Sequence, residues 1–183
     1  MLLAAGRGTR FGGAKLAAEL DGKPVLRHAA DMLRALPFAA HIAVIGSATP
    51  DPGDYATVLL DPPDAPQAQS LALGIGAARD TGARAVLVAL ADMPLVPAEH
   101  ITALIAAFDG DRIGSRGAAA VMPPALFGAR HFDTLCALPG DRGAGALLRD
   151  APCLPLSTDQ ELDIDRPEDL ARAAQILGAR AIR

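Results

Sequence analysis

Short apolar runs alternate along the chain with longer segments in which apolar residues recur at helical spacing. The short runs have the length of β-strands and cover residues 1–4, 41–46, 56–60 and 85–91. The last run contains Val-Leu-Val-Ala-Leu at 86–90 and is apolar on both faces. Such a run is typical of a parallel strand that helices cover on both sides.

The longer segments predict helices over residues 23–36, 70–79, 98–108 and 167–177. Alternating strands and helices favour an α/β fold with a mostly parallel sheet. We therefore predict one three-layer α/β/α domain over residues 1–183, built on a Rossmann-like sheet. The stretch 109–125 is less regular, with Gly, Ser, Arg and two prolines, and we interpret it as an insertion near the functional site.

Composition narrows the classes of function. The 183 residues carry a formal net charge of −4, which argues against general attraction to a nucleic-acid backbone. No run of apolar residues approaches the length of a membrane span, and no charged segment introduces a leader. We expect a cytoplasmic protein without nucleic-acid or membrane partners. Any phosphate binding must then come from a local cluster of cations.

The first loop, within LLAAGRGTRFGGAK at residues 2–15, is such a cluster, with four glycines, two arginines and a lysine. It is not the dinucleotide fingerprint, because Phe11 stands where that motif needs its third glycine. It is not a P-loop either, because Lys15 is followed by Leu16 rather than Ser or Thr. The loop is therefore of another type.

The chemistry of this loop still favours a phosphate. Glycines let backbone N–H groups approach an anion, and Arg7, Arg10 and Lys15 add charged donors. We also expect a helix to begin near Ala14 and to direct its positive end at the ligand. The alternative is a flexible turn that carries solvated cations.

Two acidic positions complete the pattern. Asp92 follows the buried strand at 85–91, and the carboxyl ends of such strands are where open α/β sheets bind ligands. A carboxylate facing a polyphosphate needs a cation between them, usually Mg²⁺, although a turn aspartate before Pro94 is the alternative. In LDIDRPEDL at 162–170, an extended backbone would place Asp163 and Asp165 on one side, so either could share a metal with Asp92.

Four ordered motifs resemble the molybdopterin nucleotidyltransferase-like (MobA-like NTP transferase) family of the nucleotide-diphospho-sugar transferase fold. They are LAAGRGTRFGGAKL, DGKPVLRH, LADMP and DIDRPEDL. The Ala4-Ala5-Gly6 form and GDRGAGALL at 140–148 resemble the branch of molybdenum cofactor cytidylyltransferases. The resemblance implies that CMP passes from CTP to the phosphate of molybdenum-molybdopterin, with Mg²⁺ as cofactor and pyrophosphate as product.

Carried over position by position, the resemblance implies three groups of site residues. Arg10, Lys15 and Asp92 are the implied catalytic residues, and Asp92 and Asp165 are the implied metal ligands. The implied nucleotide-binding residues are Ala4, Ala5, Gly6, Arg7, Gly8, Arg10, Lys15, Gln67 and Ser70. A molybdenum hydroxylase or its chaperone is the implied protein partner.

The sequence also departs from the family pattern. The Gly-Gln-Ser-x-Ser-Leu element is Pro66-Gln-Ala-Gln-Ser70-Leu here, and the Arg-Gly-His-Pro element before the acceptor pocket lacks its His near Arg116. Arg166 stands where a Thr usually caps the last helix. These departures leave open another NTP, a sugar or alcohol phosphate acceptor, or a non-catalytic nucleotide-binding assembly factor for molybdenum enzymes.

Overall fold

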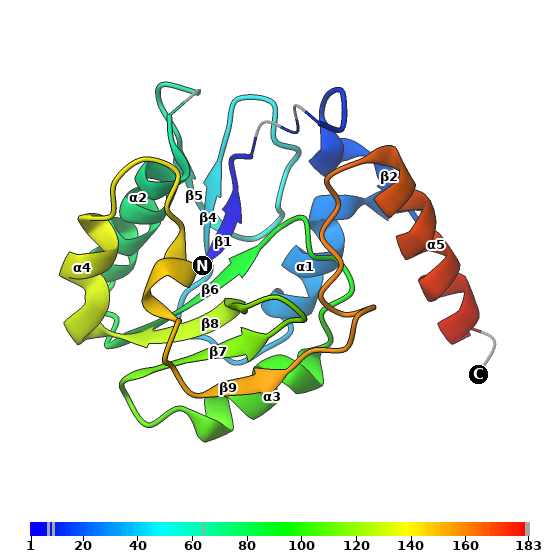
Figure 1. Ribbon diagram of the computed structural model, residues 1–183. Helices are drawn as coiled ribbons and strands as arrows, with labels where there is room; N and C mark the ends of the chain where they lie inside the picture. The colour runs from blue at the N-terminus through cyan, green and yellow to red at the C-terminus, as the bar shows by residue number, and fades with distance from the viewer. Residues whose placement is uncertain (7, 9, 64, 182–183) are drawn as a thin grey trace.

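The computed structural model describes residues 1–6, 8, 10–63 and 65–181 (Figure 1). These residues form a seven-stranded sheet in the order β5-β4-β1-β6-β8-β7-β9 and a separate two-stranded ribbon of β2 and β3. The strands are β1 (Leu2–Ala4), β2 (Glu19–Leu20), β3 (Lys23–Pro24), β4 (Ile42–Ile45), β5 (Ala56–Leu59), β6 (Ala85–Leu90), β7 (Arg112–Arg116), β8 (Val121–Gly128) and β9 (Cys153–Pro155). Only β8 runs against its neighbours in the main sheet, so the sheet is mostly parallel, as predicted.

Helices cover both faces of this sheet. They are α1 (Val25–Arg34), α2 (Gln67–Asp80), α3 (Ala98–Ala107), α4 (Phe132–Cys136) and α5 (Pro167–Ala181), with 3₁₀ turns η1 (Lys15–Ala17), η2 (Ala129–His131) and η3 (Ala144–Leu147). Alternate residues of β6 divide between two apolar clusters. Leu87 and Ala89 pack with α1 and α3, while Val86 and Val88 pack with α2 and α4. A strand with two buried faces explains the unbroken apolar run in the sequence.

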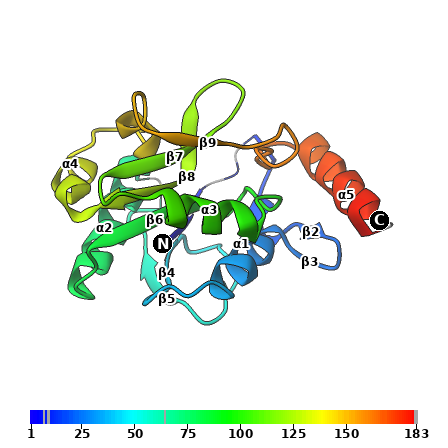
Figure 2. The same cartoon turned by 90° about the horizontal axis from the view of Figure 1, so that it is seen from below.

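The first strand and the last helix occupy very different places relative to the main sheet. Strand β1 lies in the middle of the sheet between β4 and β6. Helix α5 lies at one end of the molecule beside β2, as both Figure 1 and Figure 2 show. Among the described residues, no helix combines the length and the apolar character needed to cross a membrane.

The structure corrects two expectations. Residues 109–125 are not an insertion, because they supply β7 and most of β8, two strands of the main sheet. The helix expected near Ala14 is only the single 3₁₀ turn η1, whose three residues offer no extended helix terminus to an anion. The other predicted strands and helices are present with ends shifted by up to four residues.

Helix α2 approaches the sheet closely through one glycine. A Cβ built on Gly74 would lie 2.1 Å from the Met1 sulfur and 2.9 Å from Cγ2 of Val44, which is closer than atoms can pack. Two residues along the same helix, a Cβ built on Gly76 meets no atom within 4 Å from the described residues outside its own stretch of helix. Because α2 begins at the edge where β1 and β6 end, this close packing also places the first turn of α2 relative to the loops there.

Replacing these glycines should have opposite effects on stability. Gly74→Ala should lower the free energy of unfolding by about 1–3 kcal/mol, because the methyl group forces the packed helix and sheet apart. Gly76→Ala should raise it by up to about 1 kcal/mol, since alanine favours a helix and meets no obstacle. Urea denaturation of both variants measures the difference. Equal effects of the two substitutions would contradict the close approach at Gly74.

Candidate functional site

Two adjoining cavities lie at the sheet edge where β1, β4 and β6 end. The first, of about 320 Å³, lies between the residues that follow β1 and the turn that follows β4. The second, central cavity, of about 240 Å³, adds the first turn of α2 and Asp92 beyond β6. Both cavities are lined by Ala5, Gly6, Lys15 and Leu16, so the loop after β1 forms the boundary that they share.

The centre of the site is an ammonium group held between two carboxylates. Nζ of Lys15 donates to Oδ2 of Asp92 at 2.7 Å and to Oδ1 of Asp165 at 2.8 Å. The Lys15 side chain is 7% exposed, whereas those of Asp92 and Asp165 are 22% and 38% exposed. The ammonium is thus the most buried member of the group, and the two carboxylates are more exposed than it is.

Backbone contacts bring Asp165 to this position. The N–H of Ile164 donates to the carbonyl of Asp92 at 2.8 Å, which fixes the segment before α5 against the end of β6. Leu162 and Ile164 are buried while Asp163 is exposed, so the alternation expected from the sequence is present without a strand. Of the two candidate acids, Asp165 is the one that pairs with Lys15.

The start of α5 is capped in an unexpected way. Arg166 offers no side-chain cap, as its sequence position suggested, but Oδ2 of Asp169 accepts from the N–H groups of Arg166 at 2.7 Å and Asp165 at 3.0 Å. An acidic side chain in the first turn thus replaces the missing hydroxyl. This contact also fixes the backbone of Asp165.

The charges around Lys15 shift neighbouring pKa values in opposite directions. Burial alone would lower the pKa of Lys15, but the charges and hydrogen bonds of Asp92 and Asp165 raise it overall. The hydrogen bond from Lys15, with help from Arg10, lowers the pKa of Asp165. Partial loss of hydration and the charges of Asp92 and Asp165 raise the pKa of the Asp163 carboxyl, and the Lys15 charge offsets only part of this effect.

The first loop, which follows β1 and is called the glycine loop below, folds back over the Lys15 group. Gly8 has φ of +58°, and a Cβ there would lie 2.4 Å from the carbonyl oxygen of Gly13, so the turn requires glycine. The Gly8 carbonyl accepts from the N–H of Phe11 at 3.0 Å. Arg10 is exposed and contacts Oδ2 of Asp165 at 3.2 Å, which places a second cation at the rim. Arg7 lies outside the described residues.

The first turn of α2 supplies the polar wall of the central cavity. Gln67 and Ser70 both line it, and Ser70 is 5% exposed. Ala4 contributes the end of β1 to the same cavity. The structure therefore brings together every described residue that the sequence singled out for the nucleotide.

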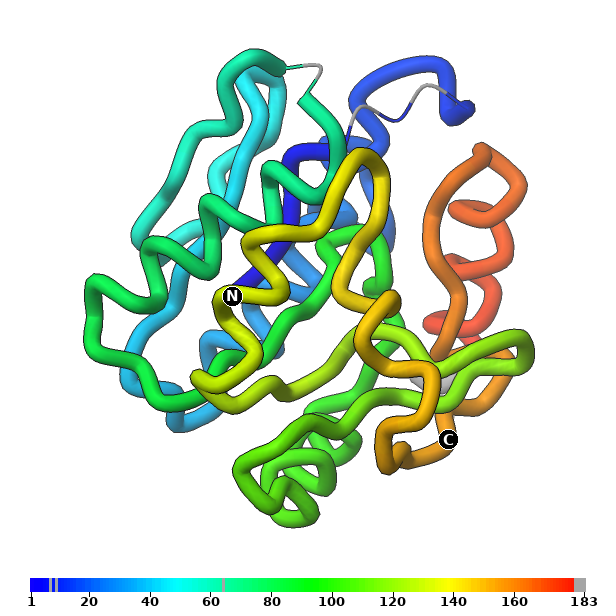
Figure 3. Tube along the Cα trace, turned by 60° about the vertical axis from the view of Figure 1, so that its left-hand side comes forward, coloured from blue at the N-terminus to red at the C-terminus, as the bar shows by residue number. Residues whose placement is uncertain are grey.

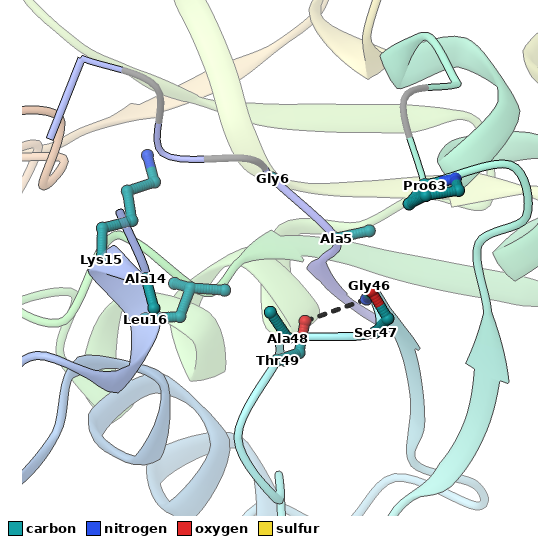
Figure 4. Close-up of a pocket in the computed structure, with 10 residues that line it drawn as sticks. All are labelled: Ala5, Gly6, Ala14, Lys15, Leu16, Gly46, Ser47, Ala48, Thr49 and Pro63. Carbon is teal, nitrogen blue, oxygen red and sulfur yellow. Dashed lines mark hydrogen bonds between the residues drawn. The ribbon is translucent and has the colours of Figure 1, made fainter. Parts of the chain in front are cut away.

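The turn after β4 was not singled out by sequence reasoning, yet it forms one side of the first cavity. Oγ1 of Thr49 accepts from the N–H of Gly46 at 2.9 Å and donates to the carbonyl of Ala4 at 2.8 Å, which ties this turn to the end of β1. Figure 4 shows Lys15 and Pro63 on opposite sides of the cavity, with Ser47, Ala48 and Thr49 between them. The signal that could have identified this turn is its position directly after a parallel strand that lies beside β1.

The two carboxylates suit a divalent cation. They already converge on one positive charge, and hard oxygen donors are the ligands that Mg²⁺ prefers. Within the described ranges, no group of three or more His, Cys, Asp or Glu side chains is arranged to hold a metal ion. Mg²⁺ is commonly bound through one or two carboxylates together with substrate phosphates and water. Asp92 and Asp165 therefore fit an ion that arrives with a polyphosphate.

Replacing Asp165 and replacing Asp163 should change the melting temperature at pH 7 in opposite directions. Asp165 has a lowered pKa, so its ionised form stabilises the fold above its usual value near 3.8, and this contribution is lost as pH falls through the lowered pKa. Asp165→Asn should therefore lower the melting temperature at pH 7, with the deficit shrinking below pH of about 3.8. Asp163 has a raised pKa, so Asp163→Asn should raise the melting temperature at pH 7 and have little effect in acid. Changes in melting temperature of the same sign for both variants at pH 7 would contradict these pKa assignments.

Comparison with known proteins identifies the family. The model of the MobA-like NTP transferase domain matches residues 1–158, which is most of the chain but ends before Asp165. The chain is 29% identical over 195 residues to the purine catabolism protein PucB of Bacillus subtilis (strain 168), covering 95% of each protein.

Solved structures agree on the fold. A nucleotidyl transferase from Methanothermobacter superposes with a TM-score of 0.81 at 22% identity, over 98% of this chain and 96% of that one. The Mycobacterium tuberculosis protein Rv0371c in complex with manganese gives 0.77 at 23% identity, over 95% and 96%. Molybdopterin-guanine dinucleotide biosynthesis protein A from Archaeoglobus fulgidus gives 0.64 at 18% identity, over 97% of each chain.

The three-layer arrangement predicted from the sequence is thus the nucleotide-diphospho-sugar transferase fold of these neighbours. The family match spans the glycine loop, Lys15 and Asp92. The chain belongs to the MobA-like NTP transferase family.

Proposed function

We propose that the protein transfers CMP from CTP to the phosphate of molybdenum-molybdopterin and releases pyrophosphate. The observation that carries the proposal is the convergence of Lys15, Asp92 and Asp165 below the glycine loop of a MobA-like domain. In such a cluster the carboxylates can hold the metal ion of a triphosphate and the ammonium can bind its phosphates, and nucleotidyl transfer needs little more than positioning and charge stabilisation. The Ala4-Ala5-Gly6 form of the first loop is the reason for choosing CTP.

The two cavities supply a place for the nucleoside. Ala5 and Gly6 form the floor shared by both, with the Gly46–Thr49 turn on one side. Gln67 and Ser70 lie on the other side. A cytidine that rests on the backbone of Ala4–Gly6 would direct its phosphates towards Lys15 and the loop above it.

Each charged residue then has a separate task. Asp92 and Asp165 would hold the Mg²⁺ ion, which supplies positive charge beside the α-phosphate when it is bound. Lys15 and Arg10 would stabilise the charge on the departing pyrophosphate. Gly8 lets the loop close over the phosphates, and the family resemblance assigns Arg7 to the same group.

Lys15 has to exchange partners in this scheme. Its ammonium now neutralises the two carboxylates at 2.7 and 2.8 Å. With a triphosphate and its metal ion bound, Asp92 and Asp165 would hold the metal ion and the Lys15 ammonium would pair with the phosphates. Such an exchange would leave each buried charge with a partner, which avoids the large cost of an unpaired buried ion.

The reaction itself requires no covalent intermediate with the protein. An oxygen of the acceptor phosphate forms a bond to the α-phosphorus of CTP, and the bond from that phosphorus to the bridging oxygen of pyrophosphate breaks on the opposite side. Lys15 and Arg10, which contact Asp92 and Asp165 in the structure, would then stabilise the leaving group. The product is then delivered to a molybdenum hydroxylase or its chaperone, which we propose as the protein partner.

Pyrophosphate release tests this reaction. With Mg²⁺ and molybdenum cofactor, CTP should support pyrophosphate release, and GTP, ATP and UTP should support at least about tenfold less. A coupled phosphate assay under each nucleotide gives the comparison. Equal turnover with GTP, or turnover only with a sugar or alcohol phosphate, would contradict the proposed substrates. CTP binding without turnover would contradict catalysis and favour an assembly factor.

The role of Asp92 has its own test. Asp92→Asn should lower kcat by about 100-fold or more, because the substitution removes the charge that holds the metal while keeping the side-chain shape. Asp80→Asn, at an exposed position at the far end of α2, should leave kcat unchanged. Circular dichroism checks that both variants remain folded. Near-normal turnover in Asp92→Asn would refute the assignment of this carboxylate.

A further inference from the structure

A third cavity, of about 220 Å³, adjoins the central one and is not used by the donor nucleotide as placed above. It shares Leu3, Gln67 and Leu90 with the central cavity. Its remaining lining comes from Pro123 at the start of β8 and from the segment Gly143–Ala146. We call this space the glycine slot.

The loop that closes the slot, residues 140–146, is held in place by contacts with α2. The N–H of Ala68 donates to the carbonyl of Gly140 at 3.1 Å. A Cβ on Gly143 would lie 3.1 Å from the amide carbon of Gln67, so a glycine there lets the loop lie flat on this side chain. Figure 3 shows the loop, in yellow, running beside the start of α2.

The other side of the loop is anchored on the sheet. Ala144 and Leu148 are almost fully buried, and they belong to the apolar cluster that includes Val121 and Ala125 of β8. Because β8 runs antiparallel to β6, its first residues lie at the edge where β6 ends. The fold therefore places a fixed wall next to Asp92, on the side away from the Gly46–Thr49 turn.

The lining of the slot differs in chemistry from that of the central cavity. Its described residues are leucine, proline, alanine and glycine, together with Gln67, whose amide is polar. Among the described residues, none that lines the slot is charged, whereas Lys15 and Asp92 line the adjoining cavity. A ligand that spans both would put a charged end beside Lys15 and an uncharged body into the slot.

Size further restricts the occupant. Pockets for drug-sized ligands have volumes of roughly 300–1,000 Å³, so a slot of about 220 Å³ suits one ring system rather than a whole nucleotide. Walls of glycine, alanine and proline suit a flat face, and the Gln67 amide can both donate to and accept from a heterocycle. A sugar phosphate would bring several hydroxyl groups that this lining leaves without partners.

We propose that the glycine slot binds the uncharged, flat heterocycle of the acceptor, while the acceptor phosphate reaches the central cavity beside Asp92. This assignment rests on the proposed function and names the class of acceptor and its subsite. Gly145 and Ala146 then determine acceptor specificity. Apart from its chain neighbours, the one described atom within 4 Å of a Cβ built on Gly145 is the carbonyl oxygen of Val121, at 3.9 Å, so a larger side chain there has room to occupy the slot.

The test uses a heterocycle without phosphate, so that it does not depend on turnover. The probe is 6-hydroxymethylpterin, whose fluorescence can be followed directly because the protein has no Trp. Gly145→Leu and Ala146→Leu should each weaken pterin binding by about tenfold or more, because the new side chain fills the slot. Gly178→Leu, on the exposed face of α5, is the matched control and should leave it unchanged. Affinity for CTP with Mg²⁺, measured by calorimetry, should stay the same in all variants.

The outcomes separate this assignment from the proposed reaction. Pterin binding that is absent in the unmodified protein, or unaffected by both slot variants, would overturn the assignment. A loss of CTP affinity in the slot variants with pterin binding retained would also overturn it, since the slot would then hold the base. Slot-dependent pterin binding without pyrophosphate release from CTP would support the slot and refute the proposed reaction.

Discussion

The ion pair network of Lys15 with Asp92 and Asp165 is the interaction on which the site depends. It joins residues 77 and 150 positions apart in the chain, and its ammonium is almost completely buried. A buried cation without partners would be strongly destabilising, so the end of β6, the first loop and the segment before α5 must come together when the chain folds. The same groups can pair instead with a metal ion and a triphosphate, which links the folding requirement to the proposed chemistry.

The order of the strands in the sheet brings these segments together. Strands β4, β1 and β6 are parallel and adjacent, so the loops that follow them lie at one edge. Three cavities follow one another along that edge, from the turn after β4, past the glycine loop and Asp92, to the loop over β8. Strand β8, which runs antiparallel to its neighbours in the main sheet, begins at this edge and so extends the row of cavities beyond β6. The order of the strands thus sets the proposed order of nucleoside, phosphates and acceptor.

The sequence was sufficient for parts of this arrangement. The buried strand at 85–90 and Asp92 behind it were predicted from an apolar run, and Gln67 and Ser70 from their motif. Strands β7 and β8 were missed because Gly114, Pro123 and Pro124 interrupt the apolar pattern that identifies a strand. The Gly46–Thr49 turn carries no charge and no motif, so its contribution follows only from β4 lying beside β1. Spacing alone could not show which of Asp163 and Asp165 pairs with Lys15, because that depends on where the fold places the Lys15 side chain.

The exchange of Lys15 between carboxylates and phosphates is the central claim, and Mn²⁺ binding tests it most directly. Electron paramagnetic resonance titration without nucleotide would compare the unmodified protein with Lys15→Met, which keeps the length of the side chain and removes its charge. The account predicts that Mn²⁺ binds at least about tenfold more tightly to Lys15→Met, because the ammonium no longer competes for Asp92 and Asp165. Adding CTP should strengthen Mn²⁺ binding mainly in the unmodified protein. Equal or weaker Mn²⁺ binding by the folded variant would contradict the account.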